Sequence, residues 1–209
     1  MSTTAQWYDR IAWVYDTFTG VFYRSYRQTL VSALAIRSDD RILSVACGTG
    51  QSFPFYMSHL GPRGQLVGID YSKQMLARAQ RRVQRQGWSN VTLRHMDARA
   101  LSVERLAAEG LPTSFTVVVG ELAFSVIPEW QEVMRRCVAL LVPGGRLGVL
   151  DWYRPRRDLL TWIVNLTACA DVSRDIIGEA RRLLGHFVIV RRGLGGNIFV
   201  GVGRRKRSA

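Results

Sequence analysis

The chain has 209 residues, of which 47% are hydrophobic and 22% are charged. This composition excludes an intrinsically disordered chain, and the length is that of one globular domain with a sizeable core. The 29 basic and 16 acidic residues give a formal net charge of +13. Such a charge favours a polyanionic partner, such as nucleic acid, an anionic membrane or a phosphorylated substrate, or else reflects arginines dispersed over a solvated surface.

Strand-like and helix-like segments alternate along the chain, after an aromatic and arginine-rich stretch at 7–35 that predicts helices. The strand-like runs are 41–45, 65–69, 91–93, 115–119 and 146–150, and the helix-length segments are 72–86 and 129–141. Two further strand-like runs, 187–191 and 197–202, flank a short glycine-rich link that predicts an antiparallel hairpin. The sequence therefore predicts an α/β fold with a Rossmann-like, doubly wound, mostly parallel seven-stranded sheet, closed by that hairpin.

A glycine-containing turn, Ser44-Val-Ala-Cys-Gly-Thr-Gly50, follows the first predicted strand. In a doubly wound sheet, ligands bind beyond the carboxyl ends of the strands. Gly48 and Gly50 would let the backbone approach a ligand where a Cβ would clash. No Gly-Lys-Ser/Thr follows, so the turn is not a P-loop.

Two carboxylates follow the next two predicted strands. Asp70 could accept hydrogen bonds from both hydroxyls of a ribose, or it could cap the following helix. Asp97 could accept a hydrogen bond from an exocyclic adenine amine. Together these positions predict a site for an adenine nucleoside.

In order and spacing, the glycine turn, Asp70 and Asp97 resemble the class I S-adenosylmethionine-dependent methyltransferases over residues 41–152. A nicotinamide-binding Rossmann domain is disfavoured, because Cys-Gly-Thr-Gly replaces Gly-x-Gly-x-x-Gly and a second acid is present. The resemblance implies one domain over 1–209, with an N-terminal helical lid (1–40), a cofactor-binding core (41–152), and a substrate-side helix with the hairpin (153–209). It implies S-adenosyl-L-methionine as the cofactor and no metal. The cofactor-binding residues that it implies are Ser44, Ala46, Cys47, Gly48, Gly50, Asp70, Tyr71, Met75, Asp97, Ala98, Gly120 and Glu121.

Two positions depart from the family's pattern. Family members usually carry an acid where Ser44 stands and a glycine where Ala46 stands. Ser44 keeps an acceptor for the cofactor's amino group but loses the charge. Glu121, at the end of the fourth predicted strand, could supply that charge, or it could face solvent beyond the strand.

The N-terminal stretch Trp7-Tyr-Asp-Arg-Ile-Ala-Trp-Val-Tyr-Asp16 is similar to the opening of methyltransferases that act on quinones and phospholipids. In those enzymes the corresponding helices lie over the cofactor as a lid. Its apolar residues recur at three- and four-residue steps with arginines beside them. This pattern suits an amphipathic helix on an anionic bilayer, or a helix packed on its own domain.

The loop Leu122-Ala-Phe-Ser-Val-Ile-Pro-Glu-Trp130 resembles the Ser-x-Ile-Pro-x-Trp loop of bacterial phospholipid and betaine-lipid N-methyltransferases. It lacks the Arg-Asn pair that quinone C-methyltransferases typically carry. A neutral amine needs in-line placement on the sulfonium methyl more than it needs a strong base. The sequence thus predicts N-methylation of a phospholipid headgroup such as that of phosphatidylethanolamine, with a quinone or a soluble metabolite as the alternative acceptor.

Further side chains are candidates for handling this substrate. Those that could relay a proton from an ammonium, and are therefore candidate catalytic residues, are Tyr8, Tyr15 and His186. Those that could bind a lipid phosphate or face a quaternary ammonium are Arg24, Arg27, Arg154, Trp130 and Trp152. Asp151 would be either a substrate contact or a helix cap.

Nucleic acid is disfavoured as a partner, because the fourth strand carries no Asn/Asp-Pro-Pro-Tyr/Phe signature, and a non-catalytic scaffold is the least favoured interpretation. Three scattered cysteines match neither a disulfide framework nor a zinc site, which favours a reducing compartment. Residues 1–9 lack the pattern of a signal peptide. We therefore expect a cytoplasmic protein, peripheral to the inner face of the cytoplasmic membrane if its substrate is a lipid.

Overall fold

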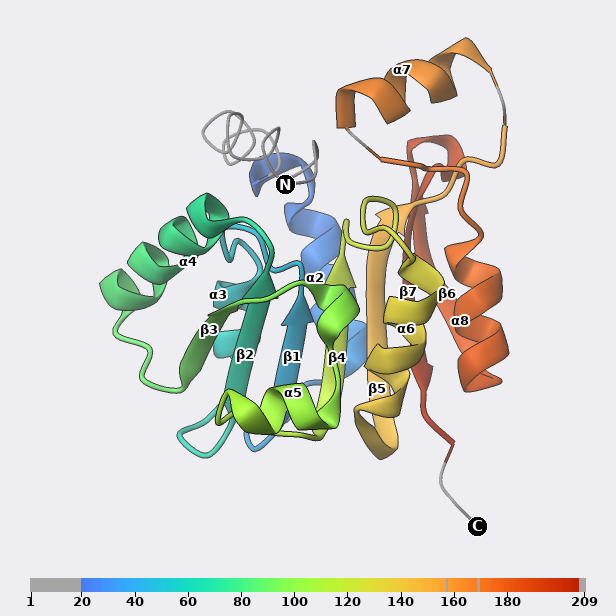
Figure 1. The fold of residues 1–209 in the computed structure, drawn as a ribbon. Coiled ribbons are helices and arrows are strands. Elements are labelled where there is room, and N and C mark those ends of the chain that lie inside the picture. Colours follow the sequence, from blue (N-terminus) through green and yellow to red (C-terminus); the bar gives the residue numbers. More distant parts are fainter. Residues whose placement is uncertain (1–19, 157, 169, 207–209) are drawn as a thin grey trace.

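The computed structural model describes residues 20–156, 158–168 and 170–206. Its strands form one seven-stranded sheet with the order β3-β2-β1-β4-β5-β7-β6 (Figure 1). They are β1 (Arg41–Val45), β2 (Gln65–Asp70), β3 (Val91–His95), β4 (Phe115–Glu121), β5 (Leu141–Trp152), β6 (Phe187–Gly193) and β7 (Ile198–Arg204). Strands β1 to β5 pair in parallel, and β7 is antiparallel to both β5 and β6. The predicted fold class is confirmed.

Helices cover both faces of the sheet. They are α2 (Arg24–Leu34), α3 (Phe53–Met57), α4 (Lys73–Gln86), α5 (Val103–Ala108), α6 (Trp130–Ala139), α7 (Leu159–Ala168) and α8 (Ile176–Leu184), with short 3-10 turns at η1 (Ala98–Ala100) and η2 (Leu194–Gly196). Buried side chains of α2, α3 and α4 pack on one face, and those of α5, α6 and α8 pack on the other. The domain is therefore a three-layer sandwich.

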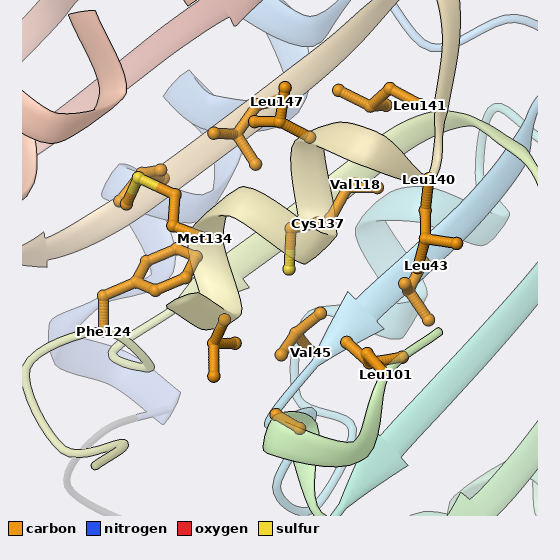
Figure 2. Packing of buried hydrophobic residues seen from close by; sticks show 14 of the residues in the cluster. Leu43, Val45, Leu101, Val118, Phe124, Met134, Cys137, Leu140, Leu141 and Leu147 are labelled. Carbon is orange, nitrogen blue, oxygen red and sulfur yellow. The ribbon is translucent and has the colours of Figure 1, made fainter. Parts of the chain in front are cut away.

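The alternation of side chains along β1 shows why this strand lies at the centre. Leu43 and Val45 point into the layer with α5, α6 and α8, whereas Ile42 points into the layer with α2, α3 and α4. All three are fully buried, as expected for a parallel strand covered on both faces. Figure 2 shows Leu43 and Val45 packed among Val118, Met134 and Cys137, where α6 crosses the sheet.

The chain reverses its direction of travel across the sheet at β1. It leaves β1 on one side to form β2 and β3, and it returns on the other side to form β4. Loops that leave β1 and β4 in opposite directions open a crevice at their carboxyl ends, which is where doubly wound sheets bind ligands.

One glycine-containing segment that resembles a turn is instead part of a strand. From its composition, Pro143-Gly144-Gly145 is expected to precede the fifth strand, yet β5 runs through it, and the pairing with β4 skips from Leu141 to Arg146. The antiparallel chain end explains the difference. Gly144 donates a backbone hydrogen bond to Arg205 at 3.1 Å, and Arg205 donates one to Gly145 at 2.8 Å.

Candidate cofactor pocket

A pocket lies at the carboxyl ends of β1, β2, β3 and β4. Most of its wall comes from the loops that follow these strands. The residues that line it are Arg27, Ser44, Ala46, Cys47, Gly48, Thr49, Gln51, Ser52, Asp70, Tyr71, Ser72, Met75, Met96, Asp97, Ala98, Arg99, Glu121, Leu122, Val126, Ile127 and Pro128. Ten of the twelve predicted cofactor residues are in this wall, and the other two, Gly50 and Gly120, are not.

Gly50 and Gly120 have packing roles instead. A Cβ on Gly50 would lie 2.7 Å from the ring of Phe53, and one on Gly120 would lie 2.5 Å from the ring of Phe124. Gly50 also has a φ of 71°, in the left-handed region that glycine adopts without strain. Both glycines therefore have a packing role behind the pocket wall, and their contact with a ligand stays a prediction.

Asp70 joins two sides of the pocket. One of its carboxylate oxygens accepts a hydrogen bond from the backbone amide of Gly48 at 2.7 Å, and the other accepts one from the amide of Ser72 at 2.8 Å. Burial raises the pKa of Asp70, while these amides oppose the shift. Because an ionised carboxylate can accept about four hydrogen bonds, each oxygen retains capacity for a ribose hydroxyl.

The helix that follows Asp70 begins at Ser72. The Ser72 side chain accepts a hydrogen bond from the amide of Met75 at 3.1 Å, so Ser72 is the N-cap of α4. Asp70 precedes this cap, and its carboxylate supports the loop while facing the pocket. The sequence alone could not separate these two roles.

Asp97 is held by a residue that sequence reasoning missed. The guanidinium of Arg99 donates to both carboxylate oxygens, at 2.7 Å from Nη2 and 3.2 Å from Nε, and it also reaches Glu129 at 3.1 Å. These contacts lower the pKa of Asp97, with the Arg99 side chain as the largest cause. An adenine amine at Asp97 would share these oxygens with Arg99. The only sequence signal for this ion pair is the spacing of Asp97 and Arg99 at i and i+2.

Glu121 lines the pocket and does not face solvent beyond the strand, and its carboxylate already has partners within the protein. Its carboxylate accepts hydrogen bonds from the hydroxyls of Ser52 and Tyr56, and it forms an ion pair with the Nε of Arg27 at 3.2 Å. The side chains of Arg27 and Glu121 are only 7% and 11% exposed. Burial, followed by the charge of Glu121, raises the pKa of Tyr56 well above its usual value. Arg27, predicted to bind lipid phosphate, therefore already carries a buried counter-charge at the pocket wall.

Three other predicted substrate residues do not line the pocket. Trp152 donates from its indole nitrogen to the hydroxyl of Tyr23 at 2.9 Å, and Trp130 packs against the core beneath α6. Arg154 donates to Thr161 at 2.9 Å and to Asn197 at 3.2 Å, and it pairs with Asp158. Each of these side chains therefore has a contact within the fold, and its role toward a substrate stays a prediction. Arg24 is exposed on α2, outside this wall.

The structure places His186, a predicted catalytic residue, far from the pocket. His186 is exposed and directly precedes β6, the edge strand that lies four strands from β1 in the sheet. Four strand spacings amount to about 19 Å. In addition, β6 runs parallel to β5, so His186 lies at its amino end, away from the edge where the pocket opens. Tyr8 and Tyr15 lie outside the described residues.

Asp151 is neither a substrate contact nor a helix cap. It is fully buried and accepts backbone hydrogen bonds from Phe124 at 2.9 Å, Ser125 at 3.2 Å and Trp152 at 2.8 Å. Asp151 therefore ties the loop after β4 to the end of β5. Burial nevertheless raises its pKa to about 6 from the ordinary 3.8.

This raised pKa predicts a pH dependence of stability. The folded state binds the Asp151 proton more tightly than the unfolded state does, so the stabilisation is complete below pH 4 and is lost as the pH rises through about 6. The shift corresponds to about 3 kcal/mol. In urea titrations from pH 4 to 7, the unfolding free energy of wild type minus that of Asp151→Asn should therefore fall by up to that amount. A difference that stays flat with pH would contradict the assignment.

Ala46 occupies a strained conformation in the glycine turn. Its φ is 52°, a region that costs an L-residue about 1–2 kcal/mol. Ala46→Gly should therefore stabilise the protein by about 0.5–1 kcal/mol after the added freedom of the unfolded chain is counted. We expect the melting temperature to rise by about 1–4 °C. Ala77→Gly, at an exposed position within helix α4, is the control and should lower it.

The fold and the pocket together define a Rossmann-like protein that binds a nucleoside-containing cofactor. Its lining suits such a ligand, because the carboxylates of Asp70 and Asp97 share the wall with the apolar side chains of Met75, Met96 and Ile127. A Cβ on Gly48 would meet no protein atom within 4 Å, so the space beside the turn is open.

Residues 42–145 match the family described as a methyltransferase domain. The chain is 25% identical to a demethylmenaquinone methyltransferase of Listeria welshimeri over 152 residues, 71% of this chain and 61% of that protein. It is 33% identical to a phosphatidylethanolamine N-methyltransferase of Cereibacter sphaeroides over 141 residues, 67% of this chain and 64% of that protein. The chain thus spans less than two thirds of the length of these curated relatives.

A solved structure described as an S-adenosylmethionine-dependent methyltransferase from Aquifex aeolicus has the same fold. Its TM-score is 0.62 at 16% sequence identity, over 85% of this chain and 88% of that one. The chain therefore carries a methyltransferase domain, as the sequence predicted, and it shares its fold with an S-adenosylmethionine-dependent methyltransferase.

Proposed function

We propose that the chain transfers the methyl group of S-adenosylmethionine to the amine headgroup of a phospholipid. In this proposal Asp70 binds the ribose hydroxyls, and Asp97 with Ala98 faces the adenine. The glycine turn and the cluster around Glu121 hold the amino-acid end of the cofactor. When bound, the cofactor supplies an electrophilic sulfonium methyl group to an acceptor placed beside the loop that follows β4.

The composition of that loop carries the proposal. Leu122, Val126, Ile127 and Pro128 line the pocket, and residues 122–128 contain no arginine, asparagine or histidine. Methylation of a ring carbon requires a base to remove the proton from that carbon, whereas a neutral amine already presents its lone pair. An apolar wall of this kind suits an amine that is positioned by the rest of a lipid molecule.

An ammonium headgroup must lose a proton before transfer. Since His186 is remote from the pocket, Tyr8 and Tyr15 are the remaining candidates from the sequence for this step. The similarity to a phosphatidylethanolamine N-methyltransferase supports an amine acceptor. The net charge of +13 favours an anionic membrane as the place where the acceptor is met.

A quinone is the second candidate acceptor. It is favoured by the similarity to demethylmenaquinone methyltransferases, which extends over 71% of this chain. The loop after β4 argues against it, because residues 122–128 contain no arginine, asparagine or histidine that could help to remove the ring proton.

Incubation with radiolabelled S-adenosylmethionine tests the two acceptors directly. Vesicles of phosphatidylethanolamine, vesicles that carry demethylmenaquinone, and soluble phosphoethanolamine would be compared by chromatography of the labelled products. We expect label in mono- or dimethylated phosphatidylethanolamine, and much less label with Asp70→Ala at a cofactor concentration below saturation. Label in the quinone alone, or in phosphoethanolamine alone, would refute the phospholipid proposal while leaving the methyltransferase intact.

A further inference from the structure

Helix α7 exposes apolar side chains and turns polar ones toward the protein. Leu159, Trp162 and Leu166 are 71%, 61% and 62% exposed, and their spacing at i, i+3 and i+7 places them on one side of the helix. Thr161 is buried on the other side. Helix α8 has the opposite and usual arrangement, with Ile176 and three further apolar residues buried.

The inward side of α7 is fixed by hydrogen bonds. The hydroxyl of Thr161 accepts from Arg154, in the loop after β5, at 2.9 Å. The amide oxygen of Asn165 accepts from the backbone of Val172 at 3.0 Å. Since these contacts hold the polar side against the body, the apolar side must face outward. The exposure of the apolar side of α7 therefore follows from the contacts of its polar side.

The exposed side lies at the end of the molecule where the cofactor pocket opens. Helix α7 follows the carboxyl end of β5, and Figure 1 shows it beyond the strand ends, at the same end as the start of α2. There the chain exposes two more large apolar side chains, Val21 at 81% and Phe22 at 44%. Apolar groups from two distant parts of the sequence therefore surround the same end of the molecule.

The charges beside α7 are suited to an anionic surface. The two carboxylates near the helix, Asp158 and Asp171, are paired with Arg154 and Arg174, so they add little net negative charge. Arg156 is exposed just before the helix, and Arg157 follows it in the sequence. An apolar helix side with an exposed cationic residue, Arg156, next to it is the arrangement of helices that lie in a membrane interface.

We propose that α7 docks the protein on an anionic lipid bilayer, with Leu159, Trp162 and Leu166 entering the interface and Arg156 at the headgroups. Tryptophan is favoured at this depth. A helix of ten residues is about 15 Å long, so it lies in the interface and does not cross the membrane. Among the described residues, no helix has the length and apolar content of a membrane span. This inference deepens the proposed function, because docking would bring the pocket to a lipid acceptor. It rests on the proposed function only for the biological purpose of the docking.

Vesicle flotation tests the docking. Wild type would be compared with the triple variant Leu159→Gln/Trp162→Gln/Leu166→Gln on 1:1 phosphatidylglycerol–phosphatidylethanolamine vesicles. Val188→Gln/Val190→Gln, at exposed positions of the edge strand β6, is the matched control. We expect the triple variant to lose more than tenfold in partition coefficient and the control to bind as wild type. Because apolar burial is not screened, wild type should keep part of its binding at 0.5 M salt.

Three results would overturn the proposal. Wild type could fail to bind these vesicles, or the triple variant could bind as well as wild type. Alternatively, sedimentation could show a dimer that the triple variant dissociates without any change in vesicle binding, which would make a second copy the occupant of this surface. Thermal melting would verify that the triple variant remains folded.

Methyl transfer to monomeric dihexanoyl phosphatidylethanolamine separates this inference from the proposed function. If both are correct, the triple variant should methylate the dissolved lipid as wild type does and lose activity on vesicles. Vesicle binding that depends on α7, without methylation of any lipid, would leave the docking intact and refute the proposed acceptor. Methylation of the dissolved lipid without vesicle binding would refute the docking and leave the proposed acceptor intact.

Discussion

The Asp70→Ala variant is expected to bind S-adenosylmethionine about 30- to 150-fold more weakly than wild type. The substitution removes two charge-assisted hydrogen bonds to the ribose, which corresponds to about 2–3 kcal/mol. The structure adds a second contribution, because Asp70 also accepts from the amides of Gly48 and Ser72 and so holds the glycine turn against the start of α4. Titration calorimetry would measure the affinity.

The matched control is Asp39→Ala, which removes the same charge from an exposed position before β1, at the opposite end of that strand from the pocket. Its affinity for the cofactor should equal that of wild type. Melting of both variants without cofactor separates loss of binding from loss of fold. Unchanged affinity in a folded Asp70→Ala protein would remove Asp70 from the cofactor site.

The Arg27→Glu variant is expected to be strongly destabilised. It would place a second carboxylate beside Glu121, where the present ion pair is almost completely shielded from water. Breaking a buried pair typically costs about 3–5 kcal/mol, because one charge is left uncompensated. For a chain of this length, the melting temperature should fall by about 6–20 °C. Arg24→Glu, three residues earlier and exposed, should stay within about 0.5 kcal/mol of wild type.

A double variant distinguishes charge from packing. Arg27→Met with Glu121→Gln removes both charges while keeping similar volumes, and it should recover most of the stability lost in Arg27→Met alone. Equal melting temperatures for Arg27→Met and the double variant would contradict the expected recovery of stability. The burial of Arg27 also affects how contact of the predicted N-terminal lid with a membrane can be tested. Arg27 is buried, so charge reversal at this residue cannot serve as a test of membrane contact, whereas Arg24 can.

The sequence determined the scaffold of the site because the signals for it are local. Apolar runs of strand length alternating with helical segments predicted the parallel sheet, and the link at 193–196 predicted the hairpin. A ligand site at the strand ends follows from that topology alone. For this reason the amino-acid sequence was sufficient to assign Asp70, Asp97 and the glycine turn to one pocket.

Tertiary structure alone decided what each charged side chain does. Arg27 and Glu121 are 94 positions apart in the sequence, and Asp151 is 26 positions from Ser125, so no local pattern could pair them. Whether a carboxylate contacts a ligand, supports a loop or neutralises an arginine depends on which groups share its buried environment. The same reason applies to α7. Its sequence contains both apolar and polar residues, but only the contacts of Thr161 and Asn165 with the body determine that the apolar side faces outward.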